Sequence, residues 1–254
     1  MNPGRIAALS ASGVAVEVVV ETGSTNADLL ARAPTLQRPV LLVAENQTAG
    51  RGRAGRSWLS SAAGSLTFSL AWRFDGGPQQ LAGLPLAVGV ALAETLAHLG
   101  VQVQLKWPND LLRDGDKLAG ILIETQSAQG GGVWAVIGIG LNLLMPDELE
   151  AQIGRSVAAV PWLAQMDRDT LVAALLDGLA QALHEFGRAG FGAFAARWNL
   201  RHGYQGELVT IIDRGAVLHE GVAAGVDDAG RLLLDTAGGR IAVLAGDVSL
   251  RVKE

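Results

Sequence analysis

The stretch Glu45–Phe74, ENQTAGRGRAGRSWLSSAAGSLTFSLAWRF, decides the fold. Glycine occupies every second or third position of its loop portion, and Arg51, Arg53 and Arg56 stand among the glycines. Glycine lets a backbone approach a ligand closely, and guanidinium groups are planar, permanently charged donors. A loop of this composition suits polyanions.

A dinucleotide-binding fold is the first alternative for this loop. Gly50, Gly52 and Gly55 match the G-x-G-x-x-G fingerprint, which requires a strand before it and a helix after it. Pro39–Ala44 supplies the strand pattern. After the loop, five apolar residues alternate with small, polar or charged ones: Leu66, Phe68, Leu70, Trp72 and Phe74. A period of two indicates a half-buried strand, so the pattern argues against this fold.

Two further interpretations stay open from the loop alone. An RNA-binding arginine–glycine segment belongs in a basic or low-complexity context, whereas this chain has a formal net charge of −5. A solvated surface loop is the plain alternative, because short motifs often match by chance. The residues downstream of the loop favour a functional site.

Length and composition bound the fold and the chemistry. A chain of 254 residues, of which 49% are hydrophobic, predicts one large globular domain and a small appendage. The absence of cysteine excludes disulfides, cysteine nucleophiles and thiolate metal sites, and the four scattered histidines argue against zinc. The chain has no run of about 18 uninterrupted apolar residues and its N-terminus lacks the features of a signal peptide, so we expect a cytoplasmic protein without membrane contact.

A strand and a helix are predicted ahead of the loop. Val14–Val20 has the alternation of a strand, and Ser24 or Thr25 can cap a helix that continues to Arg32. A helix N-terminus also offers free N–H groups, which can bind a carboxylate or an amide-like head group. The local sequence does not decide between a cap and a binding site.

Three helices are predicted downstream. Gln79–Leu99 predicts a long packed helix, in which Pro85 marks a kink or the true first turn. Asp167–Phe186 and Gly190–Trp198 carry apolar residues at helical spacing and predict a structural pair of helices.

A compact polar cluster follows the strand pattern Val101–Trp107. Leu111–Glu124 predicts a hairpin with its turn at Asp114-Gly115. An Asn-Asp pair after a strand is ordinary turn chemistry. Here it is flanked by two of the only three lysines in the chain, which makes a cluster of donors, acceptors and cations that a turn does not need: Lys106, Asn109, Asp110 and Lys117.

The strand pattern Val133–Leu143 carries glycine on one face, at Gly138 and Gly140. Glycine inside a strand forfeits side-chain packing, so something else must occupy the space above it. A ligand across the sheet and a closely packed helix both satisfy this pattern.

The pattern changes at His202 to short strands separated by glycine-containing turns. The predicted strands are Leu208–Ile212, Val217–Gly221, Leu232–Asp235 and Ile241–Leu244. This spacing predicts a small all-β barrel or sandwich. We therefore divide the chain into a domain of residues 1–201 and a β domain of residues 202–254.

Taken together, these motifs resemble those of bacterial biotin protein ligases. The resemblance rests on order and spacing across about 120 residues. The matching motifs are Ser24-Thr25-Asn26, the loop from Gln47 to Trp58, Lys106-Trp107-Pro108-Asn109-Asp110, Lys117 to Glu124, and Gly138 to Asn142.

The resemblance implies an α+β fold: a mixed β-sheet with helices on one face, like the ligase domain of class II synthetases, and an SH3-like C-terminal β-barrel. It also implies a two-step reaction. Biotin and ATP with Mg²⁺ form biotinyl-5′-AMP and pyrophosphate, and a lysine of a biotin carboxyl carrier protein then attacks the mixed anhydride.

The resemblance also implies roles for individual residues. Lys117, Arg53 and Asp110 are the expected catalytic residues, with Asp110 facing the incoming lysine. The expected biotin contacts are Ser24, Thr25, Asn26, Gln47, Gly50, Arg51, Gly120 and Leu122. The expected nucleotide contacts are Arg53, Arg56, Trp58, Asn109, Lys117 and Asn142.

Two departures from the family pattern matter. Family members that double as repressors carry an N-terminal DNA-binding domain, whereas about 20 residues precede Glu21, so we expect no nucleic-acid partner. Ala54 stands where other members can carry a basic residue.

An exposed sheet edge allows a homodimer. The alternatives are a lipoate or octanoate ligase or transferase of the same fold, and a non-catalytic biotin-binding module.

Overall fold

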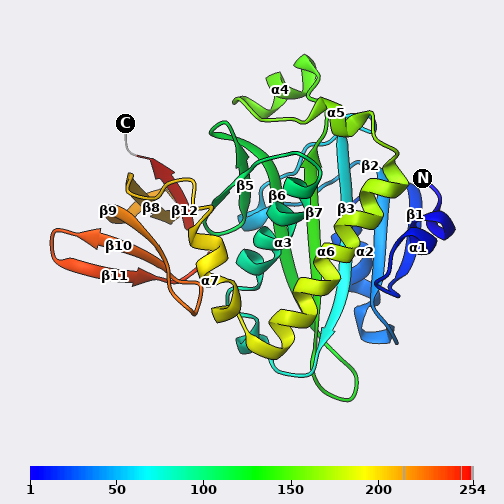
Figure 1. Cartoon of the computed structure of the whole chain (residues 1–254), viewed down its shortest axis with the longest axis horizontal. Helices are drawn as coiled ribbons and strands as arrows, with labels where there is room; N and C mark the ends of the chain where they lie inside the picture. The colour runs from blue at the N-terminus through cyan, green and yellow to red at the C-terminus, as the bar shows by residue number, and fades with distance from the viewer. Residues whose placement is uncertain (214, 247, 253–254) are drawn as a thin grey trace.

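The chain folds into two β-sheets that lie side by side, the smaller formed by its last segment (Figure 1). The computed structural model describes residues 1–213, 215–246 and 248–252. The larger, seven-stranded sheet has the order β1-β2-β3-β7-β6-β5-β4. Its strands are β1 Ala15–Thr22, β2 Val40–Gln47, β3 Ser65–Phe74, β4 Gln104–Lys106, β5 Asp110–Arg113, β6 Asp116–Ser127 and β7 Val133–Asn142. β1 and β2 run parallel and the other neighbours antiparallel, so the sheet is mixed.

One face of this sheet is covered by long helices. α3 (Leu84–His98) packs against α6 (Arg168–Ala189), and Figure 1 shows both in front of the strands. Residues 78–98 are apolar enough, by length and composition, to cross a membrane. Because α3 is enclosed between the sheet and α6, burial inside the protein accounts for that composition.

The other face has a smaller apolar cluster under α2 (Thr25–Arg32). Alternate residues of a strand point to opposite faces, so Leu41 and Val43 join the large core while Val40 and Leu42 join the cluster under α2. α2 begins at the Ser24 cap, whose side chain accepts a hydrogen bond from the Ala27 N–H. It covers only part of its face, and the remainder forms the floor of the site described below.

Most predicted elements agree with the structure, with differences at their ends. Pro85 lies in the first turn of α3, after a short 3₁₀ helix at Pro78–Leu81. The hairpin turn falls at Asp114-Gly115, where both residues have positive φ (53° and 87°), as a two-residue hairpin requires. The strand predicted over Val101–Trp107 is wrong in length, because only Gln104–Lys106 pairs with β5.

Several elements had no counterpart in the sequence prediction. They are the helices α1 (Pro3–Leu9), α4 (Asp147–Ile153) and α5 (Pro161–Ala164), the 3₁₀ turns at Ala33–Thr35 and Arg53–Gly55, and the strand β12 (Val248–Val252). Helices as short as these bury few residues, so their sequences carry little periodicity. α7 (Gly192–Asn199), which was predicted, packs on α3.

The smaller sheet is antiparallel, with the order β11-β10-β9-β8-β12. Its strands are β8 Leu208–Asp213, β9 Ala216–Val226, β10 Leu232–Thr236, β11 Gly239–Val243 and β12 Val248–Val252. The predicted α+β fold, with a mixed sheet and a C-terminal β domain, is confirmed.

The smaller sheet is fastened to the strand that leads into the polar cluster. The Trp107 indole Nε1–H donates to the Gly230 carbonyl at 3.2 Å. The connecting segment runs beside β4, where the Leu105 N–H donates to the Arg201 carbonyl at 2.7 Å and the Gly203 N–H donates to the Leu105 carbonyl at 2.9 Å. The division at residues 201 and 202 falls in this segment and stays a prediction.

Candidate active site

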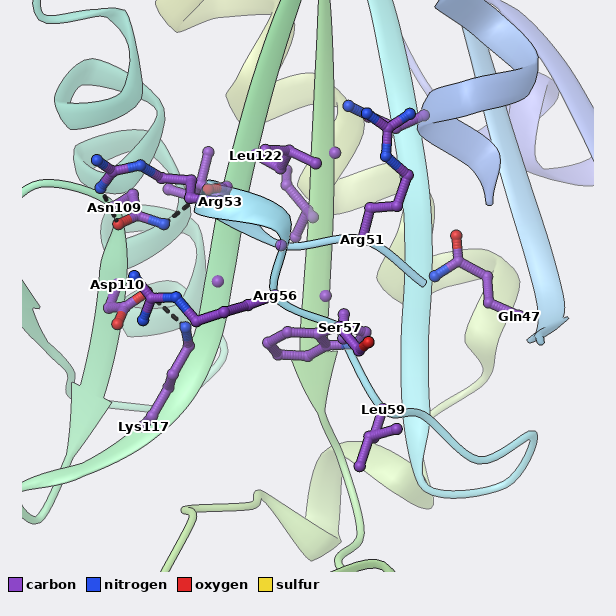
Figure 2. A pocket seen from close by; sticks show the side chains of 18 of the residues that line it. Gln47, Arg51, Arg53, Arg56, Ser57, Leu59, Asn109, Asp110, Lys117 and Leu122 are labelled. Atoms are coloured by element: carbon purple, nitrogen blue, oxygen red, sulfur yellow. Dashed lines mark hydrogen bonds and ion pairs between the residues drawn. The ribbon is translucent and has the colours of Figure 1, made fainter. Parts of the chain in front are cut away.

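A cavity of about 640 Å³ opens on the part of the sheet that α2 leaves uncovered. Figure 2 shows the arginine loop on one side of it and Asn109, Asp110 and Lys117 on another. The segment after α4 contributes Arg155, and β12 contributes Arg251. The predicted site residues that line it are Ser24, Thr25, Asn26, Gln47, Arg51, Arg53, Arg56, Trp58, Asn109, Asp110, Lys117, Gly120, Leu122 and Asn142.

The floor of the cavity is built from glycines on neighbouring strands. Gly120 of β6 lies opposite Gly140 of β7. A β-carbon at Gly140 would lie 2.2 Å from the Trp58 indole, and one at Gly138 would lie 2.4 Å from the Asn26 Oδ1. Both positions therefore require glycine. The space above them, which the sequence assigned to a ligand or a packed helix, holds Asn26 of α2 and the loop side chain Trp58.

The arginine loop folds back on itself as a small hairpin. The Trp58 N–H donates to the Gly50 carbonyl at 2.9 Å, and the Gly52 N–H donates to the Arg56 carbonyl at 2.7 Å. Ala54 and Gly55 both have positive φ at its tip. Gly50 is the one predicted site residue outside the cavity lining: it forms the base of this hairpin, where a β-carbon would lie 2.4 Å from the Trp58 carbonyl oxygen.

The Trp58 side chain lies between the arginine loop and the glycine floor of the cavity. Its ring lies over Gly140, with the Lys117 ammonium 5.6 Å from the ring centroid. Its buried Nε1–H has no hydrogen-bond partner within the described part of the chain. An unpaired buried donor is unfavourable, so a ligand that offers an acceptor here gains a hydrogen bond.

The hairpin β5–β6 brings the predicted catalytic pair together. The Lys117 Nζ lies 2.6 Å from the Asp110 Oδ1, and both side chains are half-buried. Arg53 donates to the Asn109 Oδ1 at 2.8 Å and also to the Gly246 carbonyl, while Asn109 donates to the Ile121 carbonyl at 2.9 Å. The arginine loop and the hairpin are thus joined across the cavity (Figure 2).

Asn142 lines the cavity, whereas Lys106 does not. The buried Asn142 amide donates to the Lys117 carbonyl at 3.4 Å and to the Ala158 carbonyl at 3.2 Å, which joins the hairpin to the segment after α4. Lys106 does not line the cavity; its ammonium lies 5.2 Å from the Tyr204 ring centroid. Burial, partly offset by Asp110, lowers the pKa of Lys106 to about 8.

A buried polar cluster occupies the other end of the cavity. The Gln47 Oε1 accepts from the Thr25 N–H at 2.9 Å and from the Thr25 hydroxyl at 3.1 Å. The Ser69 hydroxyl lies 2.7 Å from the Thr25 hydroxyl and donates to the Asn26 Oδ1 at 2.8 Å. These paired donors and acceptors suit a polar, amide-like head group.

Among the residues at or beside the cavity that sequence reasoning missed are Ser69, Glu124, Arg155 and Arg251. Ser69 and Glu124 carried a detectable signal, because each lies on the strand face that also holds the glycine floor. Arg251 lies on β12, which was not predicted. Arg155 follows the unpredicted α4, so neither had a sequence context.

Comparison with known proteins identifies the family. Residues 17–142 match the biotin/lipoate A/B protein ligase family, and residues 205–251 match the biotin protein ligase C-terminal domain. The bifunctional ligase/repressor BirA of Escherichia coli is 36% identical over 97% of this chain and 76% of its own length. The chain belongs to the biotin protein ligase family. The predicted family and enzyme class are thereby confirmed.

Two further biotin protein ligases extend the comparison. The biotin–[acetyl-CoA-carboxylase] ligase of Mycobacterium tuberculosis is 38% identical over 92% of this chain and 88% of its own length. The solved biotin protein ligase of Aquifex aeolicus, in complex with biotin and ATP, has a TM-score of 0.76 and 27% identity. That match covers 94% of this chain and 99% of the A. aeolicus chain.

Proposed function

We propose that this cavity binds biotin and ATP, joins them as biotinyl-5′-AMP, and transfers the biotinyl group to a lysine of a carrier protein. The observation that carries the proposal is the meeting of Arg51, Arg53, Arg56 and Lys117 above a glycine floor, beside a neutral polar cluster. Cations suit the carboxylate and the phosphates, and the polar cluster suits the biotin head group. The biotin and ATP complex of the A. aeolicus relative supports the same assignment.

Adenylate formation needs positive charge at the reacting atoms. A carboxylate oxygen of biotin attacks the α-phosphorus of ATP, the bond from that phosphorus to the bridging oxygen breaks, and pyrophosphate leaves with the electron pair. Two anions must approach each other, so preorganised cations lower the barrier. We assign this role to Lys117, which pairs with Asp110, and to Arg53, which donates to the neighbouring Asn109 (Figure 2).

Magnesium fits this site as a companion of the ATP phosphates. The only acidic residue among those described in the cavity lining is Asp110, and no group of three metal-ligating side chains occurs in the described residues. Mg²⁺ prefers phosphate oxygens, waters and one or two carboxylates, so Asp110 is the protein group that could hold it. When bound, the ion neutralises phosphate charge.

Transfer of the biotinyl group needs a neutral amine. The carrier lysine nitrogen attacks the acyl carbon, the bond to the phosphate oxygen breaks, and AMP leaves. We assign Asp110 the role of orienting the amine or accepting its proton. In the described structure its carboxylate pairs with Lys117 at 2.6 Å; once Lys117 turns to the phosphate, the carboxylate becomes available to the amine.

Pyrophosphate release is the first test of this proposal. MgATP would be offered with biotin, lipoate or octanoate separately, followed by mass spectrometry of a biotin carboxyl carrier domain. We expect turnover with biotin and a single biotinyl mass on one lysine. Turnover with lipoate or octanoate alone would assign the chain to the sister enzymes, and tight biotin binding without turnover would indicate a binding module.

Three narrower statements stay predictions. A homodimer could form through β1, which lies at an open edge of the larger sheet. The absence of a nucleic-acid partner and the cytoplasmic location are likewise untested.

A further inference from the structure

Glu124 joins two parts of the cavity that come from different elements. It lies on β6, two residues beyond Leu122, and its side chain is 21% exposed. Its Oε1 lies 2.5 Å from the Arg51 Nη2 of the arginine loop, and its Oε2 accepts from the Asn26 Nδ2 of α2 at 2.9 Å. Glu124 itself does not line the cavity. It therefore reaches the site through its two partners.

The hydrogen bonds of the polar cluster require an acceptor at this position. The Ser69 hydroxyl donates to the Asn26 Oδ1, which leaves the Asn26 amide N–H groups to donate onward. Glu124 receives that donation with one carboxylate oxygen and Arg51 with the other. A continuous series of contacts thus runs from Thr25 through Ser69, Asn26 and Glu124 to Arg51.

Arg51 is set apart from the other loop arginines. In Figure 2 its side chain extends in a different direction from those of Arg53 and Arg56, which extend toward Asn109 and Asp110. Arg51 lines the cavity, and Glu124 takes the Nη2 end of its guanidinium. The Nε and Nη1 donors remain to bind an anionic ligand, since the guanidinium fork donates in several directions at once.

We propose that Glu124 is a positioning residue that holds Arg51, and with it the arginine loop, against the head-group end of the cavity. The inference rests on the proposed function for its ligand, biotin and then biotinyl-5′-AMP. The contact between Glu124 and Arg51 is present without either ligand. Loss of the Glu124 carboxylate then loosens the loop and shortens retention of the adenylate, while the cations that drive adenylate formation stay in place.

The test uses Glu124→Gln, which keeps an acceptor for Asn26 but removes the charge that holds Arg51. Glu17→Gln is the matched control, because Glu17 pairs with Arg32 at 2.8 Å and neither residue lines the cavity. Both variants would be compared with the wild type by limited trypsin cleavage after Arg51, Arg53 and Arg56, with and without biotin. Release of preformed biotinyl-5′-AMP would be followed in a chase with excess biotin.

Glu124→Gln is expected to release the adenylate about tenfold faster, the effect of one charged hydrogen bond. Cleavage of the loop should accelerate several-fold, while pyrophosphate formation at saturating biotin stays within about threefold. Glu17→Gln should match the wild type. Loop cleavage and adenylate release within about twofold of the wild type in Glu124→Gln would overturn the inference.

A double-mutant cycle tests whether Glu124 acts through Arg51. Arg51→Met breaks the same contact from an exposed loop, so it does not depend on whether the Glu124 variant folds. If Glu124 acts through Arg51, adding Glu124→Gln to Arg51→Met has no further effect on loop cleavage. Additive effects would contradict the inference. Failure of the proposed function would be seen separately, as a wild type that forms no adenylate, and the cleavage experiment without biotin would still test Glu124.

Discussion

The two halves of one sheet face differ in how they are covered. On the half under α2, β7 presents Trp134 and Val136 to Leu29 and Leu42. Two residues further along the same strand and face, β7 presents Gly138 and then Gly140, and the cavity begins. The apolar half excludes water by helix packing. The glycine half is covered by an arginine loop and a polar cluster, which a ligand can share.

This difference shows how one strand serves stability and chemistry at once. The register of β3, β7 and β6 places Ser69, Gly138 and Leu122 in one row across the sheet. A period of two along each strand keeps such a row on one face. Removing side chains at two positions is sufficient to turn a packed face into a binding floor, because a β-carbon there would collide with Asn26 or Trp58.

The largest expected effect comes from removing the cation above the glycine half. Lys117→Ala should slow adenylate formation about 10³-fold, because charge in the transition state loses a preorganised partner. Biotin affinity should fall by less than about tenfold, since we propose that the head group binds at the other end of the cavity. Stopped-flow pyrophosphate release and calorimetry would measure the two. Equal losses in both would contradict the charge-stabilising role.

In the apolar half, we expect a substitution to lower stability while leaving activity nearly unchanged. Leu42→Ala removes a side chain that is 2% exposed and packs under α2, so it should cost about 3 kcal/mol of unfolding free energy. Urea denaturation would measure this. The rate of pyrophosphate release by the folded variant should stay near that of the wild type; a large loss would mean that the two halves are not separate.

Gly140→Ala tests the boundary between the halves. The added β-carbon would lie 2.2 Å from the Trp58 indole, so Trp58 must move and the loop with it, and we expect about a 10²-fold loss of activity. Gly187→Ala is the control, because its β-carbon would lie 3.7 Å from Phe74, an ordinary contact. Unchanged Trp58 fluorescence and activity in Gly140→Ala would show that the indole is not held over the floor.

The smallest effect concerns Lys106, a cation of β4 that lies outside the cavity lining. Burial lowers its pKa to about 8, so the folded protein binds fewer protons than the unfolded chain between about pH 8 and the ordinary lysine pKa. Below pH 8 the charged side chain is held at a free-energy cost, and that cost disappears as the pH rises.

Lys106→Met should therefore be more stable than the wild type at pH 7, by about 1 kcal/mol after allowance for screening. The difference should shrink between pH 8 and pH 10, because the wild type then loses its proton in the folded state. Thermal unfolding across this range would measure it. A difference that does not change with pH would contradict the lowered pKa.

Much of the fold could be predicted from local patterns. Alternation in Leu66–Phe74 predicts β3, and Asp114-Gly115 predicts the hairpin turn that brings Lys117 beside Asp110. Apolar spacing in Asp167–Phe186 predicts α6. Patterns of this kind are readable because one periodicity extends over many residues. The short helices α1, α4 and α5 lack that length, and β12 alternates apolar and polar residues over only five positions.

The candidate site was predictable as a set of residues, but its connections were not. Motif order brought together Lys117, Asp110 and the loop arginines, whereas nothing in the sequence near Glu124 indicates that it contacts Arg51, 73 residues earlier. The glycines of β7 indicated that another group occupies the space above them, but not which group. Trp58 fills that place because the loop hairpin closes between Gly50 and Trp58.

By itself the sequence determined the types and order of the longer elements, the cationic loop, and the need for space above Gly138 and Gly140, since these depend on local periodicity and on residue chemistry. Only the tertiary structure decided which side chains meet: Arg53 with Asn109, Arg51 with Glu124, Trp58 over Gly140. Those pairings depend on the register of strands far apart in the chain. A one-residue change of register would turn each strand's side chains to the opposite face.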